Sequence, residues 1–233
     1  MDAKRIIPVL QVREDLVVEG SSWLGPPAEL AGRLEREGAD GVIFQAWDGA
    51  GLGAWTGSQA GWVRKVAGSL FIPFAVEAAF GGLEDLDALL GAGADQAILP
   101  AAAGGASLLV EAALRFGRCH VAAAVAAQAV GAGWRVALGE AEGRDALAWM
   151  AELEQRGAGE ILLQLAPGVA GAELLFQGAA RLALPVLFRF AGPESGWAQA
   201  LLHGADGVAF PAGLCPAGAC KSTLAAHGLS LRG

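Results

Sequence analysis

The sequence contains no tyrosine, only three histidines and few charged residues. Charged residues make up 17% of the chain, against about 25% in an average soluble domain. We therefore expect part of the surface to be covered, by a protein partner or by a second copy of the chain. His120, His203 and His227 lie far apart, and only His120, beside Cys119, has a second metal-binding side chain next to it. We expect no metal site and no cofactor.

Cysteine and positive charge are also scarce. Cys119, Cys215 and Cys220 are odd in number and follow no zinc-like spacing, so we expect buried or idle thiols. Lysine and arginine number 16 against 24 aspartates and glutamates, which gives a net charge of -8. Binding to a phosphate backbone requires a basic face, so the composition argues against a nucleic-acid partner.

Long apolar runs are missing. The longest apolar stretches, 97–110 and 121–127, are short or rich in alanine and glycine. Both fall below the roughly 18 residues that a membrane span requires. The N-terminus passes from Lys4-Arg5 directly into an apolar strand, without the longer segment and cleavage site of a secretory signal. We expect a cytoplasmic protein with no membrane span.

The sequence does contain a repeated device in which a helix ends, the chain turns and a strand follows. The first strand, 6–10, is apolar throughout, which is typical of a strand buried on both faces. A glycine that ends a helical pattern then leads into an apolar strand four times, at 38–44, 93–99, 157–163 and 204–210. Three more apolar runs lie between these copies, at 72–76, 120–125 and 184–188. Eight alternating strand and helix units predict an α/β fold, the (βα)8 TIM barrel, as a single domain over 1–233.

Several segments resemble one family over essentially the whole chain. They are Lys4-Arg5-Ile6-Ile7, IPFAVEAAFGGLEDLDALLGAGADQAIL, RGAGEILL, LPVLFRFAGPESGWAQALLHGADGVAF and the ending AAHGLSLR. These resemble HisF, the cyclase subunit of imidazole glycerol phosphate synthase in histidine biosynthesis. The isomerase HisA shares parts of the pattern, but the Lys4-Arg5 start and the tail favour HisF. The resemblance implies a TIM barrel with its chemistry at the carboxyl ends of the strands.

The residues at the family's catalytic positions differ in this sequence. The resemblance implies two catalytic aspartates, and it aligns them with Gln11 after the first strand and Ala126 after the fifth. Neither side chain exchanges a proton near neutral pH, so the family's acid–base mechanism is not available to them. A further aspartate aligns with Ala46, and an asparagine–threonine pair aligns with Pro100-Ala101.

The phosphate anchors implied by the resemblance are altered too. HisF holds a substrate with a phosphate at each end, through backbone amides of glycine-rich loops and helix N-termini. A carboxylate at Glu77 would repel a phosphate, and Pro100 and Pro211 each remove an amide donor. The other altered anchors are Ala78-Ala79, Val169-Ala170-Gly171, Phe190-Ala191 and Ala212.

Six polar residues remain at the strand ends. Glu77 and Arg189 either bind a zwitterionic or anionic ligand or form an ion pair that closes the barrel mouth. We favour the ion pair, because buried charges are rarely left unpaired. Alternation along the strand does not decide whether Gln45 or Ala46 faces inward. The candidate ligand-binding residues are Gln11, Glu77, Gln128, Gln164 and Arg189.

Seven tryptophans are present. Trp62, Trp149 and Trp197 lie in helical patterns and are expected in the core. The other four fall on loops of the catalytic face and are candidate interface residues, because several large aromatic side chains on one face suggest a covered patch. Alternatively these loops fold over the mouth and bury the rings. The four are Trp23, Trp47, Trp55 and Trp134.

The opposite face of the barrel is where the resemblance implies a docked glutaminase and a ring of charged residues. Arg5, Asp95 and Glu160 keep family positions there and are further interface candidates. Gly41 and Gln96 replace a glutamate and a lysine. We therefore expect glutaminase binding to be weak or absent.

Two hypotheses follow from these residues. The one we favour is a HisF-like barrel without cyclase activity that serves as a subunit or binding module of a larger assembly. The alternative is an enzyme. It is either the histidine-pathway cyclase itself or a repurposed barrel that acts on an apolar or non-phosphorylated substrate.

Overall fold

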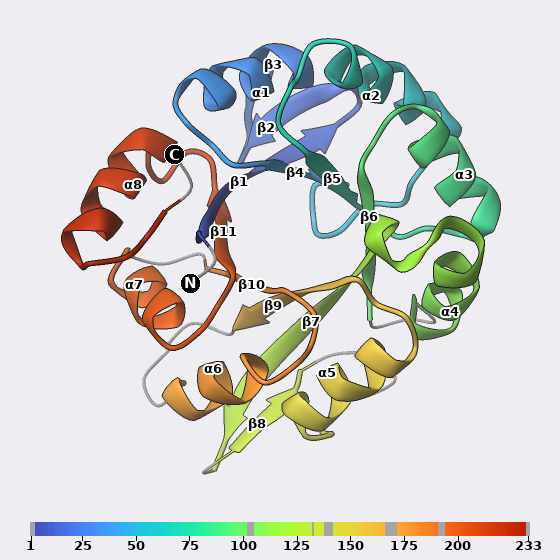
Figure 1. Ribbon diagram of the computed structural model, residues 1–233. Coiled ribbons are helices and arrows are strands. Elements are labelled where there is room, and N and C mark those ends of the chain that lie inside the picture. Colours follow the sequence, from blue (N-terminus) through green and yellow to red (C-terminus); the bar gives the residue numbers. More distant parts are fainter. Residues whose placement is uncertain are drawn as a thin grey trace.

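The chain folds into a closed barrel of eight parallel strands, which confirms the predicted (βα)8 architecture (Figure 1). The computed structural model describes residues 3–101, 105–131, 133–137, 142–165, 172–190 and 194–231. Neighbouring barrel strands pair in chain order, and the last strand pairs in parallel with the first, which closes the barrel. The barrel strands are β1 (Arg5–Arg13), β4 (Val42–Ala46), β5 (Phe74–Glu77), β6 (Gln96–Pro100), β7 (Val121–Val130), β9 (Glu160–Leu165), β10 (Val186–Arg189) and β11 (Gly207–Pro211).

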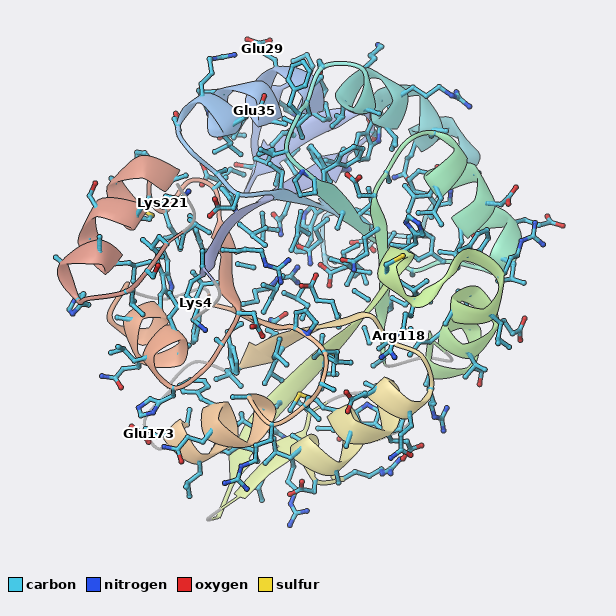
Figure 2. The ribbon with its side chains drawn as sticks, in the orientation of Figure 1. Lys4, Glu29, Glu35, Arg118, Glu173 and Lys221 are labelled. Carbon is cyan, nitrogen blue, oxygen red and sulfur yellow. A yellow bond between two sulfur atoms is a disulfide. The ribbon has the colours of Figure 1, made fainter. Side chains whose placement is uncertain are left out.

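Helices surround the barrel as an outer ring (Figure 1). Their apolar faces pack on the outside of the strands, and Figure 2 shows side chains filling the space between the two layers. They are α1 (Pro27–Arg36), α2 (Ala60–Ala67), α3 (Leu83–Gly91), α4 (Gly105–Phe116), α5 (Ala146–Gln155), α6 (Glu173–Ala179), α7 (Glu194–Leu202) and α8 (Ala217–Ala226). Two short 3-10 helices, η1 (Gly57–Gln59) and η2 (Arg118–His120), precede α2 and β7. His120 therefore lies just before its strand, one residue outside the predicted start.

The repeated glycines end helices in a left-handed conformation, as predicted. Gly93 has φ 107° and Gly204 has φ 115°. An added Cβ at Gly93 would lie 2.6 Å from the Cβ of Ala67, and one at Gly204 would lie 2.5 Å from the Cβ of Ala180. Only glycine combines this backbone conformation with so close an approach of the neighbouring chain.

The aspartates of the repeat tie consecutive strands together. The Oδ2 atom of Asp40 accepts a hydrogen bond from the backbone N–H of Ile6 at 2.8 Å. Asp95 and Asp206 bind the N–H groups of Phe74 and Val186 in the same way, at 2.9 and 2.8 Å. Each bond satisfies an amide at the start of the preceding strand, at the structural face. The aspartates of the repeat thus stabilise the contacts between neighbouring strands of the barrel.

The barrel interior is lined by small and branched side chains. Residues of alternate parity face inward, because side chains alternate across a strand. The inward layer forms a core separate from the layer beneath the helices. Its buried members are Ile7, Val9, Ile43, Ala75, Ile98, Ala122, Leu162, Leu187 and Ala209.

Three strands outside the barrel were not predicted from the sequence. β2 (Leu16–Glu19) and β3 (Ser22–Gly25) form an antiparallel hairpin on the extended end of β1. β8 (Gly133–Val136) pairs antiparallel with the extended end of β7. Both additions rise from the carboxyl ends of barrel strands, so they enlarge the mouth of the barrel.

The cysteines correct the expectation of idle thiols in part. Cys215 and Cys220 form a disulfide at the start of α8, with their Cα atoms 6.2 Å apart, while Cys119 is an exposed free thiol. The loop that leads into α8 brings residues five positions apart within bridging distance. Among the described residues, no helix is both long enough and apolar enough to cross a membrane.

Candidate functional site

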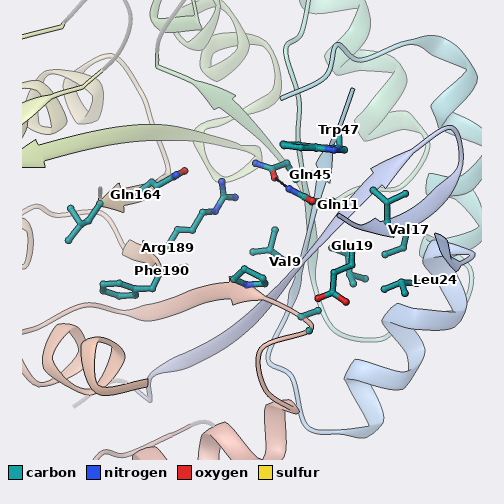
Figure 3. A pocket seen from close by; sticks show the side chains of 16 residues that line it. Val9, Gln11, Val17, Glu19, Leu24, Gln45, Trp47, Gln164, Arg189 and Phe190 are labelled. Carbon is teal, nitrogen blue, oxygen red and sulfur yellow. Dashed lines mark hydrogen bonds between the residues drawn. The ribbon is translucent and has the colours of Figure 1, made fainter. Parts of the chain in front are cut away.

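A chain of hydrogen bonds crosses the mouth of the barrel, at the carboxyl ends of the strands. Gln11 Nε2 donates to Gln45 Oε1 at 3.2 Å, and Gln45 Nε2 donates to Glu77 Oε2 at 3.0 Å. Arg189 completes the chain from the other side of the barrel, donating from its two terminal nitrogens to the Glu77 carboxylate at 3.1 and 2.5 Å. The predicted ion pair is confirmed. Figure 3 shows the Gln11, Gln45 and Arg189 side chains converging.

Strand register explains why these residues meet. Gln11 pairs with Gln45, and Gln45 pairs with Glu77. On the far side, Arg189 pairs with Gln164. Residues paired across parallel strands point to the same side of the sheet, so all five side chains belong to one layer of the barrel interior.

The same register settles the orientation at the end of β4. Gln45 faces the barrel interior, whereas Ala46 packs beneath the helices. Which residues of β4 face inward depends on the register in which β4 pairs with β1 and β5. The amino acids of β4 alone did not contain that information.

The ion pair at the centre of the layer is buried. Glu77 is 4% exposed and Arg189 is 9% exposed. Removing two charges from water is costly, and mutual attraction offsets the cost only when the geometry is good. The Nε of Arg189 is buried and has no partner among the described residues. The two opposite charges therefore balance each other, and the centre of the mouth carries no net charge.

Two cavities adjoin this layer, and they share Gln45, Gln164 and Arg189. The first has a volume of about 330 Å³ and lies beside β1, the β2–β3 hairpin, β10 and β11. The second has a volume of about 360 Å³ and lies over β5, β6 and β7. Gln11 lines the first cavity, and Ala126 lines the second. The two positions aligned with catalytic aspartates thus lie at the mouth and carry no carboxylate.

The backbone amides expected to hold phosphate are already used within the chain. Ala79 N–H donates to the Gly53 carbonyl at 3.0 Å, and Ala212 N–H donates to the Val9 carbonyl at 3.0 Å. Phe190 N–H likewise donates to the Ala209 carbonyl at 3.0 Å. Such amides cannot also cradle an anion without breaking a main-chain bond. Residues 169–171 and Ala191, which are also altered anchors, lie outside the described residues.

One candidate ligand-binding residue lies away from the mouth. Gln128 is exposed on the β7–β8 hairpin, where it pairs with Arg135, and it lines neither cavity. The reason is that β7 continues beyond the barrel to Val130 and carries Gln128 past the rim.

Glu19 and Leu24 line the first cavity and were missed in the sequence. Both belong to the unpredicted β2–β3 hairpin. Turn residues at 14–15 and 20–21 around short apolar runs are the signal that could have found it.

The four loop tryptophans divide into two groups. Trp55 and Trp134 are buried, at 4% and 9% exposed, so for them the expectation of an open patch is wrong and the inward folding is correct. Trp23 is 49% exposed, and Trp47 is half-buried and lines the first cavity. Trp62, Trp149 and Trp197 are buried in the core, as predicted.

The opposite end of the barrel is closed by a second ion pair, between Arg5 and Glu160. Burial raises the pKa of Glu160, and the charge and hydrogen bond of Arg5 oppose this effect without cancelling it. Asp95 lies beside the same opening, where a cavity of about 170 Å³ is also lined by Gly41 and Gln96. The Gln96 side chain donates to the Cys119 carbonyl at 3.4 Å.

No three histidine, cysteine, aspartate or glutamate side chains lie together as a metal site in the described part of the chain. Among the described residues that line the two mouth cavities, the ionisable side chains are those of Glu19, Glu77 and Arg189. The mouth is therefore lined by carboxamide side chains, the Glu77–Arg189 ion pair, the exposed carboxylate of Glu19 and apolar side chains.

Comparisons with known proteins place these observations in a family context. A family model described as histidine biosynthesis protein matches residues 5–166. Imidazole glycerol phosphate synthase subunit HisF of Campylobacter concisus is 38% identical over 170 residues, which cover 69% of this chain and 67% of that protein. The HisF subunit of Metallosphaera sedula is 39% identical over 172 residues, covering 70% of this chain and 68% of that protein. The HisF subunit of Dehalococcoides mccartyi is 37% identical over 169 residues, which cover 69% of this chain and 66% of that protein. The chain thus spans about two thirds of the length of these relatives.

Proposed function

Because this chain belongs to the histidine biosynthesis protein family, we propose that it is a barrel of that family without cyclase activity, which serves as a binding subunit of a larger assembly. The observation that carries the proposal is the absence of a free carboxylate at Gln11 and Ala126. Acid–base catalysis requires a group that gains and loses a proton near neutral pH, and neither an amide nor a methyl group does so.

The remaining carboxylates at the mouth do not replace the missing pair. Glu77 accepts two hydrogen bonds from Arg189 and one from Gln45, so its carboxylate is occupied by contacts within the chain. Glu19 lies on the exposed hairpin rather than on a barrel strand. The amides of Ala79, Phe190 and Ala212 are occupied by main-chain carbonyls, which further supports the loss of phosphate binding.

The exposed side chains of the β2–β3 hairpin support a role in an assembly. Leu16 is 37% exposed, Trp23 is 49% exposed and Leu24 is 46% exposed. All three belong to the β2–β3 hairpin, where Leu24 lines the first cavity and the side chain of Trp23 points to the other side of its strand. An exposed tryptophan on such a hairpin is typical of a surface that another protein covers.

The direct test is an ammonia-dependent cyclase assay with the bisphosphorylated substrate of imidazole glycerol phosphate synthase. The Campylobacter concisus HisF subunit, assayed in parallel, is the positive control. We expect turnover of that subunit and none above background for this chain. The double variant Gln11→Asp/Ala126→Asp should also stay inactive, because the phosphate sites are altered as well. Turnover of the unmodified chain close to that of the control would overturn the proposal.

The assembly is tested by comparing the native protein in host extract with the purified chain of 23.5 kDa by size-exclusion chromatography. We expect the native protein to elute as a larger species of defined composition, and the purified chain to elute at the mass of the chain or of its homo-oligomer. Elution of the native protein as a lone 23.5 kDa monomer contradicts the subunit role.

A further inference from the structure

We infer that the first mouth cavity binds an uncharged ligand that carries a carboxamide on an apolar body. The inference rests on the proposed loss of cyclase activity, and it names the ligand class of the same site. The cavity is that of about 330 Å³ beside the β2–β3 hairpin (Figure 3). Small-molecule sites usually have volumes of roughly 300–1,000 Å³ and mainly apolar walls with a few polar groups.

Charge at the mouth excludes an anionic ligand. Arg189 is the one cationic side chain among the described lining residues of both cavities, and Glu77 neutralises it at bonding distance. Glu19 adds a negative charge at the rim. A phosphate or carboxylate that enters would lose its hydration without gaining a free counter-charge, which is unfavourable.

A cationic ligand is not favoured either. Glu19 is exposed, so water and salt screen its attraction for a positive charge. Glu77 already balances Arg189 and cannot serve a second cation without leaving that guanidinium buried and unpaired. An uncharged ligand avoids both costs.

Unused amide groups point to a carboxamide. The Gln164 side chain lines both cavities and is exposed at the mouth, where it makes no hydrogen bond to any other described residue and is open to a ligand. Gln11 donates one N–H to Gln45, and its Oε1 acceptor and second N–H have no partner among the described residues. In Figure 3 both side chains point toward the Arg189 guanidinium. A ligand carboxamide supplies two donors and one acceptor, which match these groups without adding charge.

The remaining walls are suited to an apolar body. Val9, Val17, Leu24 and Phe190 line the cavity, and the half-buried ring of Trp47 stands at its edge. Burial of apolar ligand surface against such walls supplies the affinity, while the amides orient the ligand.

Three matched probes test this inference by isothermal titration calorimetry of the full chain. Indole-3-acetamide is neutral, indole-3-acetate is anionic and tryptamine is cationic, and all share one apolar body. We expect indole-3-acetamide to bind at least about tenfold more tightly than either charged probe, because a charged probe loses hydration on entry without gaining a free counter-charge. Equal or tighter binding of a charged probe, or no binding of the amide, overturns the inference.

A matched pair of variants locates the site. Gln164→Leu removes the free amide and should weaken indole-3-acetamide binding by about tenfold. Gln128→Leu makes the same change on the β7–β8 hairpin, outside both cavities, and should leave the affinity unchanged. Equal effects of the two variants contradict the assignment. Failure of the amide to bind in a chain that also lacks cyclase activity overturns the ligand class alone, whereas cyclase turnover overturns the proposed function.

Discussion

The guanidinium of Arg189 on β10 and the carboxylate of Glu77 on β5 form a two-bond ion pair across the barrel, between residues 112 positions apart in the chain. Their side chains are 10% and 5% exposed. The pair occupies the centre of the mouth, where an anionic substrate would need free positive charge. It links the fold and the proposed function. The contact that satisfies the two buried charges also leaves neither of them free to bind a substrate or to exchange a proton.

Glu77→Gln should destabilise the protein by about 3–5 kcal/mol, because it leaves the buried Arg189 charge uncompensated. The free energy of unfolding in urea measures this change. Glu152→Gln is the control, because Glu152 pairs with Arg144 and Arg156 at the surface, where ion pairs contribute little. This variant should lose much less stability than Glu77→Gln. Similar losses for the two variants would show that the mouth pair is solvated.

Trp55→Ala should cost about 3–5 kcal/mol of stability, because the ring is buried and packs near Phe80, with ring centroids 6.1 Å apart. Trp23→Ala should change stability by only about 0.5 kcal/mol, because the ring is half exposed. Urea unfolding measures both. In size-exclusion chromatography of host extract, Trp23→Ala should release the chain from its assembly. Retention of the assembly by Trp23→Ala would exclude the hairpin from the interface.

The raised pKa of Glu160 predicts a pH dependence of stability with a definite sign. Since burial raises this pKa above the usual 4.5, the folded state holds the proton more tightly than the unfolded state. The stability contributed by Glu160 is therefore present below that value and is lost as pH rises through the raised pKa. The non-titrating variant Glu160→Gln lacks this loss.

Urea unfolding of the wild type and of Glu160→Gln, from about pH 4 to about pH 8, tests this sign. The stability of the wild type relative to the variant should fall as pH rises. A relative stability that rises with pH would mean that the ion pair with Arg5 dominates over burial.

The glutaminase subunit of imidazole glycerol phosphate synthase should bind this chain weakly or not at all. The structural face keeps the Arg5–Glu160 pair, but Gly41 and Gln96 line its opening without charge. Calorimetric titration of the glutaminase into this chain and into the Campylobacter concisus HisF subunit compares the two. A tight one-to-one complex that stimulates glutamine hydrolysis would disprove the prediction.

Most of the barrel follows from local features of the sequence. The runs at 6–10 and 208–210 lie within β1 and β11, which close the sheet, and the Gly-Ala-Asp turns mark where helices end. Such features are predictable because a left-handed glycine or an apolar run acts within a few residues. The buried Glu77–Arg189 pair was also predictable, because an isolated charge cannot remain in a barrel interior.

The tertiary structure alone decided which polar groups meet and which rings are covered. Gln45 rather than Ala46 faces inward because β4 is paired in register with β1 and β5. Trp55 is buried while Trp23 is exposed, although both follow barrel strands, because the loop of Trp55 pairs with residues after β5 and the hairpin of Trp23 stands at the rim. Alternation along a strand determines which residues share a side, but the phase of that alternation relative to the barrel depends on contacts between segments far apart in the chain.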